Sequence, residues 1–465
     1  MTDPQPQKLS GDLTQGPLLK TLVLFAVPQM IGNVLQNLNG SINAVWIGQL
    51  LGDTALAATA NANIIMFLLF ALVFGFGMAA TVRIGQAWGR QDVLAARRTL
   101  GTALGLMAGI SLATTLFGMI FAPQLLDWLA TPGDSYGEAL AYLRVVFIAN
   151  PLATATMMIA MGLRGAGDAN TPLRFMVLTS LIDIALNPVL IKGMGPFPAL
   201  GIAGSAWATV IANVIGFLAM LAYIYAKDLP LRLRGSELRL LKPRRDELAF
   251  ILGKGTPMGM QMLVISGAGV IMIGLVNREG LVMAAAYGAL LQVWNYIGMP
   301  AMAIGAAVSA MVAQHIGAAR EDRVDAISRA GSVANLMLTG ALILVMFLFD
   351  GPLLQLFLGA YSPSVPLALH VQNLAIWTYL PFGVTIVLFG TLRSYGVVWT
   401  QIAVLLVSMY LVRYGCYYLL YPSLGADALW YSLLVSSVLS LVLTMAAYFY
   451  APWRRPMLQR VAAGG

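Results

Sequence analysis

Long apolar stretches alternate with short polar connections along the whole chain. Most of these stretches reach about 20 residues, the length that an α-helix needs to cross the hydrocarbon core of a bilayer. We predict one membrane-spanning helix for each of them, at residues 18–47, 55–82, 99–122, 139–163, 172–192, 201–226, 248–276, 281–313, 330–349, 369–392, 397–421 and 426–452. The pattern therefore predicts an all-α polytopic membrane protein with twelve transmembrane helices.

The composition supports this interpretation. Of the 465 residues, 59% are hydrophobic and only 10% are charged, whereas a soluble globular chain is about half apolar and about a quarter charged. So few charges cannot cover a soluble surface. The residues outside the predicted helices suffice for short loops, two tails and a linker, so we expect no separate soluble domain.

Basic side chains are concentrated in every second connection between the predicted helices. Only Lys192 and Arg278 fall in the opposite connections, although the chain has 27 basic residues and a net charge of +8. This asymmetry is the one that the positive-inside rule describes. We therefore predict a multi-pass protein of the plasma (inner) membrane with both termini in the cytoplasm, and we expect no nucleic acid partner.

The two halves of the chain resemble each other. Pro28 and Pro257 are 229 positions apart, and Pro151 and Pro381 are 230 apart. Two short motifs around Gln86 and Arg164 recur near residues 314 and 393 at the same spacing. A constant offset of this kind indicates an internal duplication.

The duplication predicts two six-helix bundles. Because each bundle has an even number of helices, both have the same orientation in the membrane, related by an axis along its normal. The expected organisation is a cytoplasmic tail at 1–17, an N-terminal lobe at 18–226, a basic cytoplasmic linker at 227–247, a C-terminal lobe at 248–452 and a cytoplasmic tail at 453–465.

Asp183 is the one acidic residue, of 19, that falls in the middle of a predicted span. A carboxylate is costly in hydrocarbon and usually marks an ion or proton site, although it can also hold helices together. Desolvation favours its protonated form, whereas hydrogen bonds from neighbouring amides favour the charged form. Asn187 lies one turn later on the same face, and Pro188 can bend the helix there.

Two further predicted helices carry polar faces in the same half of the chain. In the first span these side chains recur every three or four residues, after Pro28, and in the sixth span every four residues. We expect them to converge with Asp183 on one polar pocket. The candidate residues for proton coupling or substrate binding are Asp183, Asn187, Asn43, Asn39, Gln36, Thr209 and Ser205, with Pro28 and Pro188 as candidate points of helix bending.

Other chemistry has little support in the chain. Cys416 is the single cysteine, and His315 and His370 are the only histidines, so a metal centre or a histidine-based catalytic triad is not expected. We therefore predict that the protein is not an enzyme and has no cofactor. Arg144 and Arg413 also fall within predicted spans, and we interpret them as side chains that snorkel or form a pair near the ends of their spans.

Several motifs, at this order and spacing, resemble the multidrug and toxic compound extrusion (MATE) family over residues 18–450. They are Pro28, VWIGQLLG at 45–52, Gly85-Gln86, LRGAG at 163–167, LNP at 186–188, GIAGSAWAT at 201–209, Pro257, Gln314 and Leu392-Arg393. The resemblance implies a cation-coupled antiporter that exchanges protons or sodium for cationic amphipathic drugs or metabolites.

The chain departs from the pattern of that family at the coupling positions. Asn43 stands where the family usually has an Asp in its first span, and Asn187 where the proton-coupled branch often has an Asp. Asp183 stands where that branch often has Asn. The carboxylates of the sodium-coupled branch would align near Ile265 and Phe382, which are apolar. The chain thus resembles the proton-coupled, DinF-like branch more than the sodium-coupled NorM branch.

The predicted function is secondary active antiport by alternating access of the two bundles. The coupling ion is expected to be a proton, with sodium as the other candidate. The expected partners are a small organic cation and the lipid bilayer, and the expected state is a monomer. Two alternatives are a flippase for lipid-linked intermediates from the same superfamily and a symporter of the major-facilitator type.

Overall fold

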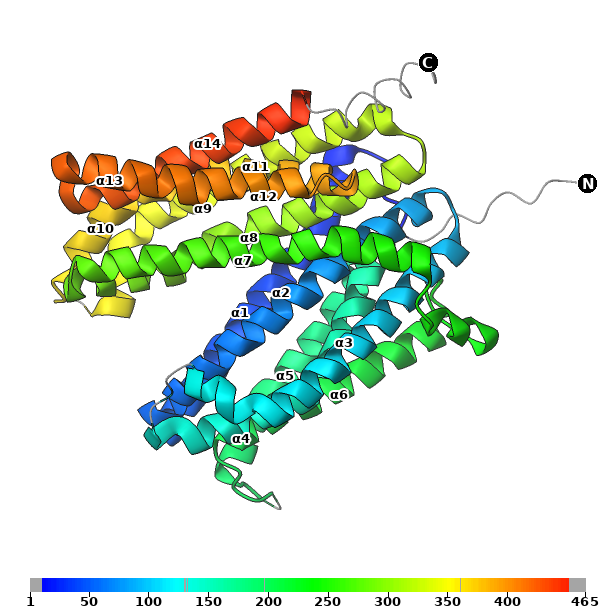
Figure 1. The fold of residues 1–465 in the computed structure, drawn as a ribbon, viewed down its shortest axis with the longest axis horizontal. Helices are drawn as coiled ribbons and strands as arrows, with labels where there is room; N and C mark the ends of the chain where they lie inside the picture. Colours follow the sequence, from blue (N-terminus) through cyan, green and yellow to red (C-terminus); the bar gives the residue numbers. More distant parts are fainter. Residues whose placement is uncertain (1–10, 129–130, 132, 196, 360, 451–465) are drawn as a thin grey trace, which may run out of the picture. The chain divides into compact units, whose positions relative to one another are not determined.

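The computed structural model describes residues 11–128, 131, 133–195, 197–359 and 361–450, without the side chains of residues 53, 57, 60, 61 and 134. The tail expected at 453–465 and most of the one at 1–17 lie outside the described residues. The described part of the chain consists of helices joined by short turns and contains no β-strand (Figure 1). The predicted all-α fold is therefore confirmed.

Each predicted span corresponds to a helical stretch. In the first half these are α1 (Leu18–Leu51), α2 (Asp53–Gly89), α3 (Val93–Trp128), α4 (Gly133–Gly165), α5 (Asn170–Lys192) and α6 (Ile202–Ala226). The short helix η1 (Gly235–Leu241) follows within the predicted linker. Several of these helices extend beyond their apolar runs, because a helix can continue past the hydrocarbon layer into water or the polar headgroups.

The second half has the same number of stretches, but two of them are composite. Its elements are α7 (Arg245–Arg278), α8 (Leu281–Gly317), η2 (Glu321–Arg323), α9 (Val324–Leu358), α10 (Ser364–Ala375), η3 (Ile376–Thr378), α11 (Tyr379–Ser394), α12 (Trp399–Leu406), η4 (Val407–Val412), α13 (Arg413–Leu424), η5 (Gly425–Asp427) and α14 (Ala428–Tyr450). Of these, η4 is a π-helical turn that continues α12 into α13.

Among the described residues, eleven helical segments are long and apolar enough to cross a membrane. The last of them, Trp399–Tyr450, has 52 residues, a helical length of about 78 Å. The hydrocarbon core is only about 30 Å thick, so this segment crosses twice, with its turn at η5. The segments therefore provide the twelve crossings that the apolar pattern predicts.

The duplication is visible in the backbone. Gly167 and Gly396 both have a positive φ, of +83° and +74°, where one helix ends and the next begins. Gly201 and Gly425 both have a φ of +56° before α6 and α14. Such dihedral angles favour glycine because it has no Cβ. The two halves thus use glycine at equivalent turns.

Helix packing repeats as well. In the first half α2 packs on α3 and α4, α4 packs on α3 and α6, and α5 packs on α6. In the second half α8 packs on α9 and α11, α11 packs on α9 and α14, and α13 packs on α14. Each contact of the first set has its equivalent in the second, so both halves build the same bundle.

Close contacts divide the described chain into two compact units. The first unit contains Gly11 and Ile31–Gly259, and the second contains Asp12–Met30 and residues 260–450. Helices α1 and α7 are both divided, at positions 229 residues apart. The first part of α1, expected in the N-terminal lobe, belongs to the second unit. The first part of α7, expected in the C-terminal lobe, belongs to the first unit.

Residues 12–14 are attached to the second unit by hydrogen bonds. The amide of Leu13 donates to Oε1 of Gln314, at 2.8 Å, at the end of α8. The carbonyl oxygen of Thr14 accepts from Arg320 at 3.1 Å and from Arg323 at 3.2 Å. Leu13 and Thr14 are both 6% exposed. This contact gives a structural role to Gln314, which belongs to the duplicated motif.

Replacing Gln314 should release this segment. Gln314→Ala removes the acceptor for the Leu13 amide, a bond that contributes about 1 kcal/mol, so that amide should exchange its hydrogen about fivefold faster. Hydrogen–deuterium exchange read by mass spectrometry on the purified protein measures this rate. The control is Gln355→Ala, at an exposed position on α9, and equal exchange in both variants would contradict the assignment.

Candidate functional site

Asp183 is the centre of a buried polar cluster in the first unit. Its side chain lies on α5 and is 1% exposed. Oδ2 accepts hydrogen bonds from Nδ2 of Asn39 and Nδ2 of Asn43, both at 2.8 Å. Oδ1 accepts from Oγ1 of Thr209 at 3.0 Å and from Nδ2 of Asn187 at 3.2 Å. Four donors therefore surround one carboxylate, which suits its charged form.

Helical spacing explains how these side chains meet. Asn39 and Asn43 are four residues apart on α1, and Asp183 and Asn187 are four apart on α5, so each helix presents two groups on one face. Helices α5 and α6 pack against each other, which brings Thr209 opposite Asp183. The cluster thus joins three helices that are far apart in the sequence.

The cluster holds more acceptors than its present donors satisfy. Oδ1 of Asn43 accepts from Nδ2 of Asn187 at 3.1 Å. Among the described residues, Oδ1 of Asn39 and Oδ1 of Asn187 are buried without a donor. A protonated Asp183 would gain a donor, and either oxygen is available to receive it after a side-chain rotation. The arrangement therefore has partners for both protonation states of Asp183.

The structure does not bring every predicted residue into the cluster. Gln36 is exposed on α1 and makes no hydrogen bond with the cluster in the described part of the chain. Ser205 is buried, but only its carbonyl oxygen takes part, accepting from Thr209 at 3.3 Å. Pro28 lies in the part of α1 that belongs to the second unit, whereas Pro188 directly follows Asn187. Both prolines lie inside continuous helices.

Tyr142 on α4 also belongs to the surroundings of Asp183. The hydroxyl of Tyr142 interacts electrostatically with the carboxylate of Asp183. Tyr142 is not among the predicted site residues. It lies in a mainly apolar stretch of α4, and a tyrosine in such a run carries no recognisable sequence signal. Only the packing of α4 identifies it.

Helix α1 makes few close backbone contacts with other elements, in contrast to α2 to α6. Its links to Asp183 through Asn39 and Asn43 are therefore an important part of its attachment to the first unit. A change in the charge of Asp183 would act directly on these two links. The cluster can thus couple the protonation of one residue to the position of one helix.

No second carboxylate site of this kind is found in the described part of the second unit. Ile265 and Phe382, at the positions where the sodium-coupled branch would carry acids, pack against an apolar core cluster. Groups of three or more histidine, cysteine, aspartate or glutamate side chains that could hold a metal ion are absent from the described residues.

A cavity of about 660 Å³ lies elsewhere, among α9, α11 and α14 of the second unit. Its lining is mainly apolar, and its two charged residues are Asp325 and Arg329. None of the predicted site residues lines it. The cavity and the Asp183 cluster are therefore separate features.

Comparison with known proteins identifies relatives over nearly the whole chain. The family model MatE matches residues 28–189 and again residues 257–419, so the match itself follows the duplication. Two proteins of Bacillus subtilis (strain 168) are similar over nearly their full lengths. Probable multidrug resistance protein YoeA is 31% identical over 444 residues, covering 95% of this chain and 96% of its own. Probable multidrug resistance protein YpnP is 32% identical over 445 residues, covering 95% and 97%.

A solved structure with the same fold is that of a multidrug resistance MATE family transporter of the MOP superfamily in an outward-facing conformation. It superposes with a TM-score of 0.88 and covers 98% of this chain and 100% of its own, at 20% sequence identity. At this identity the likeness shows the fold alone.

Proposed function

Because this chain belongs to the MatE family of membrane transporters, we propose that it exports amphipathic organic cations from the cell in exchange for protons. Members of this family are transporters and not enzymes. The names of the two Bacillus relatives, probable multidrug resistance proteins, support multidrug efflux. Neither the flippase nor the major-facilitator alternative is favoured by these relatives.

The observation that carries the proposal is the hydrogen-bond balance at Asp183. The charged carboxylate accepts four hydrogen bonds, and two buried amide oxygens have no donor. One proton bound at Asp183 would satisfy one of these oxygens and weaken the hold on Asn39 and Asn43. A buried site that can be satisfied with and without a proton suits a group that loads and unloads protons during transport.

The transport cycle follows from this coupling. With Asp183 charged, Asn39 and Asn43 hold α1 against α5. Protonation releases these links, so that α1 shifts and the affinity for substrate falls on the side where the proton binds. In such an antiporter, binding of the proton lowers the affinity for the substrate and binding of the substrate lowers the affinity for the proton. The proton gradient then provides the free energy for export. The protein acts as a monomer in the inner membrane with both termini in the cytoplasm.

Sodium is the second candidate coupling ion. The carboxylate, the hydroxyl of Thr209 and the two amide oxygens without donors could supply oxygen ligands to a hard cation. Sodium binding, however, would require the four donors that now point at Asp183 to turn away. A proton needs only one acceptor, which Oδ1 of Asn39 or of Asn187 can supply, and this favours proton coupling.

The test uses the purified protein in liposomes with a fluorescent amphipathic cation. Dye movement is recorded with a pH gradient alone and then with a sodium gradient alone, and protein-free liposomes serve as the control. We expect the pH gradient to drive transport and an ionophore that collapses it to stop transport. Transport driven by sodium alone would refute proton coupling, and no movement of several dyes would refute multidrug export.

A further inference from the structure

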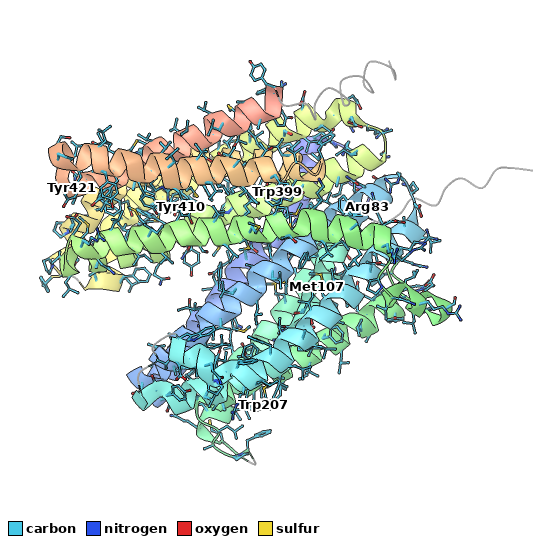
Figure 2. All side chains as sticks on the ribbon, in the orientation of Figure 1. Arg83, Met107, Trp207, Trp399, Tyr410 and Tyr421 are labelled. Carbon is cyan, nitrogen blue, oxygen red and sulfur yellow. The ribbon has the colours of Figure 1, made fainter. Side chains whose placement is uncertain are left out.

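Arg413 lies near the middle of a membrane-spanning helix. The stretch formed by α12, η4 and α13 runs from Trp399 to Leu424. Figure 2 labels Trp399 and Tyr421 towards its two ends and Tyr410 between them, one turn before Arg413. Arg413 is 6% exposed. The packing of the second unit therefore encloses this side chain, which the sequence predicts to snorkel or pair near a span end.

The guanidinium group of Arg413 has one hydrogen-bond partner. Its Nε donates to Oγ of Ser436 on α14 at 2.9 Å. In the described part of the chain no carboxylate forms an ion pair with it, and its terminal amino groups donate to no acceptor. A buried cation without a counter-charge is expensive in a membrane, and such residues commonly mark a substrate or ion pathway.

Three tyrosines interact electrostatically with the guanidinium group of Arg413, namely Tyr287, Tyr410 and Tyr414. Two of their hydroxyls are already engaged, because Tyr410 donates to the carbonyl oxygen of Val264 at 2.8 Å and Tyr414 to that of Ala268 at 2.7 Å. The hydroxyl of Tyr287 has no hydrogen bond in the described chain. The surroundings thus hold donors without acceptors, the reverse of the Asp183 cluster.

The duplication assigns Arg413 to the position of Asp183. The first residues of α5 and α12, Asn170 and Trp399, are 229 positions apart, whereas Asp183 and Arg413 are 230 apart. The π-helical turn η4 lies between Trp399 and Arg413 and accommodates the additional residue, since its hydrogen bonds span five residues instead of four. Such turns occur frequently at functional sites.

The contacts of the two charges are also equivalent. Asp183 accepts a hydrogen bond from Thr209 on α6, and Arg413 donates one to Ser436 on α14. α6 and α14 are the last helices of their bundles. Asp183 and Arg413 are therefore buried at equivalent positions of the two units, each bonded to a hydroxyl of the following helix, but their charges are opposite.

We propose that Arg413, assisted by the hydroxyl of Tyr287, binds a carboxylate or phosphate group of the transported molecule. This rests on the transport function proposed above. A guanidinium group offers two parallel donors that match the two oxygens of such an anion. The substrates then include amphipathic molecules that carry an acidic group, in addition to simple cations.

The experiment compares two dyes that differ in one group, a cationic rhodamine ethyl ester and the same rhodamine as its free carboxylic acid. Fluorescence anisotropy with the purified protein in detergent gives both dissociation constants without any ion gradient. Wild type should bind the free acid more tightly than the ester. Arg413→Gln should weaken binding of the free acid by about tenfold or more, as for loss of a charge-assisted contact, and leave the ester unchanged.

Two further variants separate charge from packing. Arg413→Lys keeps the charge without the planar fork and should restore part of the preference for the free acid. Ser436→Ala retains the guanidinium and removes its anchor, so it should weaken only the free acid, by less than Arg413→Gln. Equal binding of both dyes by wild type, or an equal loss for both dyes in Arg413→Gln, would overturn the proposal.

The outcome is independent of the coupling ion. Binding is measured at equilibrium without a gradient, so a protein driven by sodium would still show the preference that depends on Arg413. A protein driven by protons that binds both dyes equally would retain the proposed transport function and lose this inference.

Discussion

Asp183→Asn should abolish dye export driven by a pH gradient, reducing it to the rate of protein-free liposomes. The amide has the size of the carboxyl group but binds no proton at ordinary pH. Its Nδ2 can donate to one of the two oxygens that now lack a donor, on Asn39 and Asn187. The variant should therefore fold and resemble the permanently protonated state. Export is measured in liposomes with an imposed pH gradient, and folding by gel filtration.

Two control variants make this result specific. Asp183→Glu retains an acid and should keep a measurable part of the pH-driven transport. Gln36→Ala changes a polar residue of the same predicted set that lies on α1 outside the cluster, and it should transport like wild type. If Asp183→Asn still exports dye in response to pH, coupling resides elsewhere and the proposed role of Asp183 fails.

Gly75→Ala should cause a large loss of stability, because two helices touch at this position through their backbones. A Cβ at Gly75 would lie 2.4 Å from the carbonyl oxygen of Gly255 and 2.4 Å from the amide nitrogen of Gly259. Backbone atoms cannot turn aside as a side chain can, so α2 and the first part of α7 would have to separate. Overpacking of this kind costs about 1–3 kcal/mol, occasionally more. The measurement is the temperature at which half of the protein loses its monodisperse gel-filtration peak.

The matched control is Gly109→Ala on α3. A Cβ at this position meets no atom within 4 Å, and alanine is a better helix former than glycine by about 1 kcal/mol. Gly109→Ala should therefore be neutral or slightly stabilising. If both variants lose stability equally, the close contact at Gly75 is not the cause.

The sequence alone determined the membrane spans, the duplication and the identity of Asp183 as a candidate site. These features are local or periodic. A helix in hydrocarbon satisfies its own backbone groups, so hydrophobic length identifies it without knowledge of its neighbours. A carboxylate in the middle of such a run is conspicuous for the same reason, since its desolvation is costly wherever the helix lies.

The rotation of each helix about its axis decided which polar side chains form hydrogen bonds with Asp183. The same stripe on the first span offered Gln36, Asn39 and Asn43, but only the two asparagines face α5. Rotation is set by contacts between residues about 140 positions apart, which hydropathy does not record. Tyr142 entered the site for the same reason.

Only the tertiary structure decided three further features of the molecule. It assigned the first parts of α1 and α7 to the units opposite to their chain order, and it placed a π-helical turn in the helix that carries Arg413. It also enclosed Arg413, for which the sequence predicts a snorkelling or paired side chain near a span end. An arginine has a long, flexible side chain, and its surroundings are fixed by the helices packed around it and not by its own neighbours in sequence.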